Sequence, residues 1–240
     1  DEPKILAITN DGKLGIVKWE FAGKSPGYIE KFLPSGLETK KVINLIPISK
    51  GKKFSLGLLS SDGRFKRIAI DELIDISNRS TTILKLKEEV SLKTAILCEE
   101  NSYLIIITNI GRLIKIKINN LTFPLMGKLA QGPFGIKLFP QESIITAINT
   151  SLNPKENLIL VTSQTSFIKI KINSIKESLR GDLGSMSILH KNPKNKLETI
   201  ISAYTDDQLV GIMTNQGRYA RISQEDLVNI KFDKKEDFIN

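Results

Sequence analysis

Apolar residues occur along this chain in short runs that are bounded by polar turns. Five of these runs end in the same pattern: an apolar residue, Ser or Thr, Asn or Ser, a variable residue and then Gly. The anchor positions of this pattern are separated by 51, 48, 54 and 52 residues, and they are Gly12, Gly63, Gly111, Thr165 and Gly217. A period near 50 residues is typical of a propeller-like blade of four strands.

Each copy of the pattern predicts a tight β-hairpin turn, because Asn and Gly both tolerate positive φ. Thr165 replaces the glycine once, which predicts another type of turn there. A large apolar residue follows two positions after the anchor, and a β-branched residue follows three positions later, as suits a half-buried strand. The large apolar column is Leu14, Phe65, Leu113, Phe167 and Tyr219, and the β-branched column is Val17, Ile68, Ile116, Ile170 and Ile222. We expect the large apolar column to lie in the core.

Further strands are expected between the hairpins, at Val42–Ile46, Thr82–Leu86, Ser91–Leu97, Phe134–Leu138, Ile144–Asn149 and Leu197–Tyr204. The prediction is an all-β fold of about five four-stranded blades in an incomplete or spiral ring, with Ile5–Thr9 as the outer strand of the last blade. Residues 1–230 are expected to form a single domain, and the charged tail 231–240 is expected to fray. Asp71-Glu72 is interpreted as a turn or helix cap, and Ser223–Val228 as the other short helical stretch.

The chain is basic, with 35 Lys and Arg against 26 Asp and Glu and a net charge of +9. Such a balance favours a polyanionic partner, although a Lys-rich surface can serve solubility alone. The charge follows the repeat: Lys13, Arg64, Arg112 and Arg218 come directly after the anchor, and Arg67, Lys115, Lys169 and Arg221 come three positions later. This register predicts a basic track along the outer rim of the blades that contacts a duplex backbone. The alternative is that these cations protect exposed strand edges.

Glycine between basic residues also marks two connectors, residues 126–138 and 179–186, where backbone N–H groups could approach phosphate closely. An ordinary loop between blades is the competing interpretation. With these connectors, the complete set of candidate DNA-binding residues is Lys13, Arg64, Arg67, Arg112, Lys115, Lys117, Lys128, Lys137, Lys169, Lys171, Arg180, Arg218 and Arg221.

Residues for catalysis or metal binding do not gather into a motif. The only histidine is His190, and the only cysteine, Cys98, has no Cys-x-x-Cys partner. No Gly-x-x-x-x-Gly-Lys-Ser/Thr phosphate loop occurs. Tyr28 has no Arg-Tyr neighbourhood suited to DNA cleavage, and the other tyrosines lie in or beside predicted strands, where we interpret them as packing residues: Tyr103, Tyr204 and Tyr219. We therefore expect no catalytic residue, no metal, no cofactor and no small-molecule substrate. No apolar run approaches the length of a membrane helix, so no membrane partner is expected either.

These repeats and the connector Gly127–Leu138 resemble the C-terminal domain that the A subunits of DNA gyrase and topoisomerase IV share. The family's repeat has a Thr-x-x-Gly turn, a basic residue, a large apolar residue and a basic-then-apolar strand. The resemblance runs from Lys4 to about Leu227 and also includes Lys41–Pro47, which is similar to a connector between early blades.

This resemblance implies a β-pinwheel, in which neighbouring blades exchange strands. It implies a DNA-binding domain of a type II topoisomerase that bends or wraps duplex DNA and is not an enzyme on its own. The implied partners are double-stranded DNA, the ATPase subunit of the topoisomerase and the rest of its A subunit, in a cytoplasmic, nucleoid-associated setting of bacteria or organelles. The abrupt start in an apolar run predicts a domain cut from a longer protein.

The family's gyrase box, Gln-Arg-Arg-Gly-Gly-Lys-Gly, does not occur in the sequence. Two explanations stay open: the box precedes Asp1, or the protein lacks it, as topoisomerase IV does. A different class of function also stays open, namely a propeller-like scaffold that binds proteins and has an incidental basic surface. Such scaffolds usually carry Trp-Asp or Gly-Gly blade signatures, whereas Trp19 is followed by Glu20.

Overall fold

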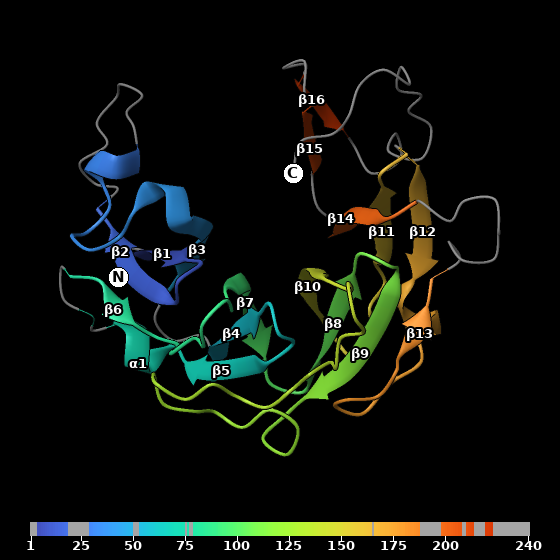
Figure 1. Cartoon of the computed structure of the whole chain (residues 1–240), viewed down its shortest axis with the longest axis horizontal. Coiled ribbons are helices and arrows are strands. Elements are labelled where there is room, and N and C mark those ends of the chain that lie inside the picture. The colour runs from blue at the N-terminus through green and yellow to red at the C-terminus, as the bar shows by residue number, and fades with distance from the viewer. Residues whose placement is uncertain are drawn as a thin grey trace. The chain divides into compact units, whose positions relative to one another are not determined.

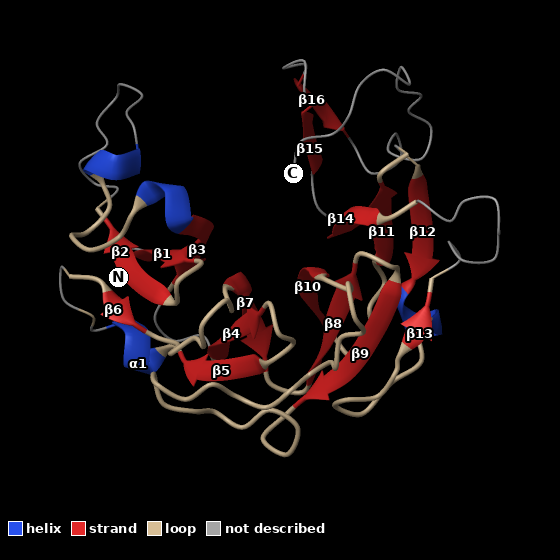
Figure 2. Ribbon diagram, in the orientation of Figure 1, coloured by secondary structure: helices blue, strands red, loops and turns tan. Residues whose placement is uncertain are grey.

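The structure is a computed structural model that describes residues 4–18, 29–49, 53–74, 76, 79–164, 166–187, 198–207, 210–213 and 219–222. Strands joined by loops make up most of this part of the chain (Figure 2). The described helices are short: α1 (Asp71–Ile74) and three 3-10 turns, at Ile29–Lys31, Thr39–Lys41 and Ile172–Ser174. The expected all-β class is confirmed.

The first blade is a four-stranded sheet in the order β3-β1-β2-β6 (Figure 1). Its hairpin consists of β1 (Lys4–Thr9) and β2 (Lys13–Val17), and β3 (Val42–Ile48) pairs with the other edge of β1. The outer strand β6 (Thr81–Thr82) reaches β2 only after the chain has built the next hairpin. Because β1 is paired on both edges, the prediction that Ile5–Thr9 completes the last blade is wrong.

The second blade repeats this topology. Its hairpin is β4 (Phe54–Ser60) and β5 (Phe65–Ala69), and β7 (Leu92–Glu99) pairs with β4. An isolated bridge between Arg64 and Phe134 brings the later connector to the free edge of this hairpin. Phe134–Leu138 therefore forms a single bridge instead of the predicted strand. The predicted strand Thr82–Leu86 is wrong beyond Thr82, the one residue that it shares with β6.

The third blade has the order β10-β8-β9-β13, with bounds β8 (Ser102–Thr108), β9 (Arg112–Ile118), β10 (Ile144–Thr150) and β13 (Ser185–Met186). The fourth has the order β12-β11-β14, with bounds β11 (Asn157–Thr162), β12 (Phe167–Lys171) and β14 (Ile200–Thr205). A fifth hairpin pairs β15 (Val210–Met213) with β16 (Tyr219–Ile222). Five described hairpins thus correspond to the five sequence repeats.

The chain divides into two compact units. One contains residues 1–102 and 117–137, and the other contains residues 103–116 and 138–240. Adjacent blades inside a unit share a core: Leu6 of β1 clusters with Leu58 of β4 in the first unit, and Ile107 of β8 with Leu160 of β11 in the second. The apolar residues that alternate along one blade are therefore buried by its neighbour. The open ring and the single domain 1–230 stay predictions.

The predicted apolar column is buried at its first three members, since Leu14 and Phe65 are 0% exposed and Leu113 is 3% exposed. Phe167 is only partly buried. Tyr219 lies in β16, where only the backbone is described. Three further predictions fall outside the described residues, namely those at Thr165, Ser223–Val228 and the tail 231–240.

Candidate nucleic-acid interface

Three crossover segments return to the hairpin edges and complete the blades; we define them as residues 79–84, 121–138 and 175–187. Each makes the same hydrogen bond with the carbonyl oxygen of a turn glycine. The N–H groups of Ile83, Gly135 and Ser187 donate to Gly12, Gly63 and Gly111, respectively, each at 2.8 Å. The repeat therefore aligns a second set of residues, in the crossover segments, that the turn motif itself does not contain.

Glycine is required at these anchors for two reasons. Gly63 has a φ of 92°, in the region that disfavours side chains. A Cβ atom at Gly63 would also stand 2.3 Å from the carbonyl oxygen of Ile136, and one at Gly12 would stand 2.4 Å from that of Leu84. The anchor glycine thus forms the turn and also admits the crossover backbone.

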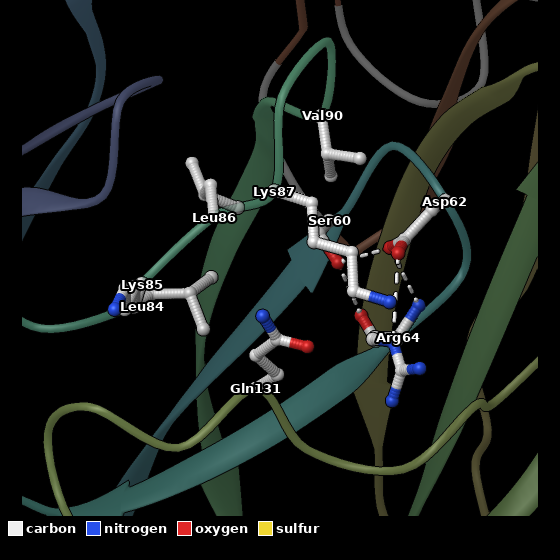
Figure 3. Close-up of a pocket in the computed structure, with 9 residues that line it drawn as sticks. All are labelled: Ser60, Asp62, Arg64, Leu84, Lys85, Leu86, Lys87, Val90 and Gln131. Carbon is white, nitrogen blue, oxygen red and sulfur yellow. Dashed lines mark hydrogen bonds and ion pairs between the residues drawn. The ribbon is translucent and has the colours of Figure 1, made fainter.

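Arg64, directly after the second anchor, is held against its crossover segment. Its guanidinium donates to Gly132 O at 2.8 Å, stacks 4.0 Å from the centre of the Phe134 ring and pairs with Asp62 at 3.5 Å. Figure 3 shows Arg64 and Asp62 beside Ser60, at a small cleft that Lys85, Lys87 and Gln131 also line.

Arg112 is the equivalent residue after the third anchor, and it is buried. It donates to both carboxylate oxygens of Glu142, at 2.9 and 2.8 Å, and to Leu183 O at 3.2 Å. Its guanidinium also lies 4.3 Å from the centre of the Phe139 ring. Burial by itself would raise the pKa of Glu142, but hydrogen bonds from Arg112, the Phe139 N–H and Thr108, together with the charge of Arg112, lower it overall.

Two members of the second basic column, Arg67 and Lys115, are also directed into the structure. Arg67 donates to the Phe123 carbonyl oxygen at 2.6 Å, to Glu100 at 2.7 Å and to Asn120 at 3.2 Å. Lys115, its equivalent one blade later, donates to Ile172 O at 3.4 Å and lies 4.9 Å from the centre of the Tyr103 ring. In both blades the cation binds a carbonyl oxygen where the chain leaves the next hairpin.

The expected exposure of the basic columns is therefore wrong at three positions. Arg67 is 1% exposed, Arg112 is 2% exposed and Lys115 is 6% exposed, and their charged ends bind carbonyls, carboxylates and rings of the protein. These cations hold blades and crossover segments together. Their DNA contact stays a prediction that this burial does not favour.

The other predicted cations are more accessible. Lys137, Lys169, Lys171 and Arg180 are exposed, whereas Lys13, Arg64, Lys117 and Lys128 are partly buried. Lys169 pairs with Asp206 at 3.4 Å. Arg218 lies outside the described residues, and Arg221 belongs to β16, where only the backbone is described.

Lys85 was missed by the sequence reasoning although the repeat contains a signal for it. Ile83 and Gly135 bond equivalent glycines, so the exposed Lys85 is the equivalent of Lys137. The two lysines are 52 residues apart, which is the repeat spacing. Aligning the crossover segments, and not only the turns, would have found it.

A metal or thiol site finds no support in the described residues. No group of three His, Cys, Asp or Glu side chains in the described ranges is placed to hold an ion. Cys98 is buried, and desolvation raises its pKa to about 12 although the charge of Arg67 acts in the opposite direction. The raised pKa disfavours a nucleophilic thiolate. Among the described helices, none has the length and apolar character to cross a membrane.

The fold and its strand exchange define a β-pinwheel, a propeller-like array of blades. The sequence matches the family "DNA gyrase C-terminal domain, beta-propeller" over residues 58–99, 102–151 and 156–205. The chain belongs to this family, as its repeats indicated.

Solved structures agree with this fold. A "C-terminal domain of DNA topoisomerase IV" is similar with a TM-score of 0.75 and 17% identity, covering 96% of this chain and 72% of that one. A "DNA gyrase A C-terminal domain" is similar with a TM-score of 0.74 and 16% identity, covering 91% and 71%. The "E. coli ParC C-terminal domain" has a TM-score of 0.59 and 14% identity, covering 97% and 91%. A search of curated proteins found no match.

Proposed function

We propose that this domain binds duplex DNA through cations of its crossover segments and bends or wraps it for a type II topoisomerase. Family membership supports the topoisomerase setting, and the net charge of +9 supports a polyanionic partner. The observation that carries the proposal is the recurrence of exposed cations on the crossover segments and next to them, at Lys85, Lys137 and Arg180.

The domain works without a reaction of its own in this proposal. The rest of the topoisomerase polypeptide cleaves DNA, a partner ATPase hydrolyses ATP, and this domain presents DNA to them. The assembly acts in the cytoplasm on the nucleoid. Phosphate contacts dominate binding, so affinity depends strongly on salt and weakly on sequence.

A salt series measured with one duplex tests the proposal. If about six phosphates are neutralised, log K falls with log salt with a slope of roughly −5. The double variant Lys137→Gln/Arg180→Gln, with one change in each unit, should reduce the magnitude of that slope by about 2.

The matched control is Lys93→Gln/Lys155→Gln, which removes two exposed cations, again one from each unit, outside the crossover segments. Its slope should equal that of the unmodified protein. Absence of binding at low salt would refute DNA binding, and a slope near zero for the unmodified protein would refute binding through phosphates. Equal losses in both double variants would mean that net charge, and not the crossover segments, determines affinity.

A further inference from the structure

Exposed apolar side chains are concentrated in two equivalent loops. We define the first edge loop as residues 125–134 and the second as residues 177–186. Six of the ten large hydrophobic side chains that are exposed in the described residues lie in these loops: Leu125, Leu129, Phe134, Leu179, Leu183 and Met186. Single exposed apolar residues are common on proteins, whereas a concentration of them marks a contact surface.

Both loops are attached to a strand edge in the same way. The first begins with a parallel bridge between Arg67 and Leu125 and returns with the bridge between Arg64 and Phe134. The second begins with the equivalent bridge between Lys115 and Glu177 and returns through the pairing of Arg112 with Met186. The same pairing in two different units shows that the two loops occupy equivalent places on their blades, and that Phe134 and Met186 are equivalent positions.

Buried and partly buried cations anchor the backbone of each loop. In the first, Lys66 donates to Lys128 O at 2.6 Å and Arg64 to Gly132 O at 2.8 Å. In the second, Arg112 donates to Leu183 O at 3.2 Å. The main chain is therefore held while side chains such as Leu129, 65% exposed, and Leu183, 68% exposed, extend into solvent. Preorganisation of this kind lowers the entropic cost of binding.

Each loop also has a tight turn that carries a cation. Ala130 N donates to Gly127 O at 3.3 Å, and Asp182 N donates to Leu179 O at 3.2 Å. The turn of the first loop contains Lys128-Leu129, and that of the second contains Leu179-Arg180. A leucine and a cation are thus adjacent in both turns.

Cations predominate in the sequence on either side of the first loop, and Asp62 lies near the loop only as the ion-pair partner of Arg64. From Asn101 to Gln141 the chain contains Arg112, Lys115, Lys117, Lys128 and Lys137 but no Asp or Glu. The acids of the second loop serve the fold: Asp182 accepts from the Leu179 N–H at 2.8 Å, and Glu177 accepts from the Tyr103 hydroxyl at 2.7 Å. Such surroundings fit an anionic partner that also offers apolar surface.

We propose that the two edge loops dock in the minor groove of duplex DNA, where their apolar side chains pack against deoxyriboses and base edges and the adjacent cations contact the flanking phosphates. This inference rests on the proposed function and specifies how the domain holds the duplex. Leu, Phe and Met are residues that minor-groove proteins insert between base steps when they bend DNA. The loops would then contribute binding free energy that salt does not screen, in addition to the electrostatic binding.

The test separates these two contributions with the full 240-residue chain. Affinity for one duplex is measured across a salt series and extrapolated to 1 M salt, where counterion release no longer favours binding. The double variant Leu129→Ala/Leu183→Ala should lower the extrapolated affinity about tenfold and leave the salt slope unchanged. Hydroxyl-radical footprinting, which reads the accessibility of deoxyribose, should show weaker protection.

The matched control is Leu45→Ala/Leu152→Ala, which truncates two exposed leucines, one from each unit, that lie outside the loops. It should change neither the extrapolated affinity nor the footprint. If Leu129→Ala/Leu183→Ala binds and protects DNA like the unmodified protein, the edge-loop proposal is overturned while DNA binding stands. If the same variant loses the binding to phosphatidylglycerol vesicles that the unmodified protein shows, and its DNA binding is unchanged, the edge-loop proposal is overturned in favour of a membrane contact. A flat salt response of the unmodified protein would instead refute the proposed function.

Discussion

Arg112 and Glu142 form a buried ion pair between β9 and the segment before β10, with side chains that are only 2% and 1% exposed. Burying two charges costs free energy that their attraction and hydrogen bonds must offset. Removing one partner therefore leaves the other charge buried and uncompensated.

We predict that Arg112→Met lowers the free energy of unfolding by about 3–5 kcal/mol. Urea denaturation followed by circular dichroism measures this loss. In Arg112→Met/Glu142→Leu both charges are absent, so the double variant should be more stable than Arg112→Met. A single variant as stable as the unmodified protein would show that the pair does not hold the blade.

The stability of the protein should depend on pH through Lys66. Burial lowers the pKa of Lys66 to about 8, although the charge of Glu72 opposes the shift. The unfolded chain, with a lysine pKa of about 10.4, binds more protons than the folded protein between these values, so stability rises with pH across this window. A shift of this size corresponds to about 3 kcal/mol.

Lys66→Met should abolish that rise, which denaturant unfolding between about pH 7.5 and pH 10.5 measures against the unmodified protein. The control Lys93→Met changes an exposed lysine of β7 and should keep the pH dependence. Parallel stability curves for the unmodified protein and Lys66→Met would contradict the prediction.

Phe65 should contribute more to stability than Phe167, although both occupy the same column of the repeat. Phe65 is 0% exposed and packs edge-to-face on Phe123 with ring centres 4.9 Å apart. Phe65→Ala should therefore cost about 3–5 kcal/mol of unfolding free energy. Phe167→Ala should cost clearly less, because Phe167 is only partly buried. Equal losses in thermal or urea unfolding would argue against the described burial.

Gly63→Ala should destabilise the second blade, because the new Cβ would meet the Ile136 carbonyl oxygen at 2.3 Å and the φ of 92° would be strained. The expected loss exceeds about 1 kcal/mol. Gly127→Ala is the matched control, since a Cβ there meets no heavy atom within 4 Å. Urea midpoints of the two variants provide the comparison, and a midpoint for Gly63→Ala that matches that of the control would contradict the role assigned to the anchor.

Much of the fold could be predicted because its determinants are local. The five turn motifs, four of which end in Gly and one in Thr165, placed all five hairpins, and alternation placed β3, β7 and β10 within a few residues. The outer strands were less predictable, because β6 and β13 contain two residues each and the connector at Phe134 makes a single bridge. Such short pairings leave no alternation to recognise.

The sequence by itself determined the number of repeats, the hairpin turns, the apolar column at Leu14, Phe65 and Leu113, and the recurrence of a cation after four of the five anchors. Only the tertiary structure decided where those cations point. Segments more than 50 residues further along the chain bring the carbonyls of Phe123 and Ile172 to Arg67 and Lys115. Charge in a sequence shows that a side chain must be solvated or paired, but the partner is chosen by packing between distant segments. For that reason the same repeat register contains both the cations that hold the blades together and those left exposed at the surface.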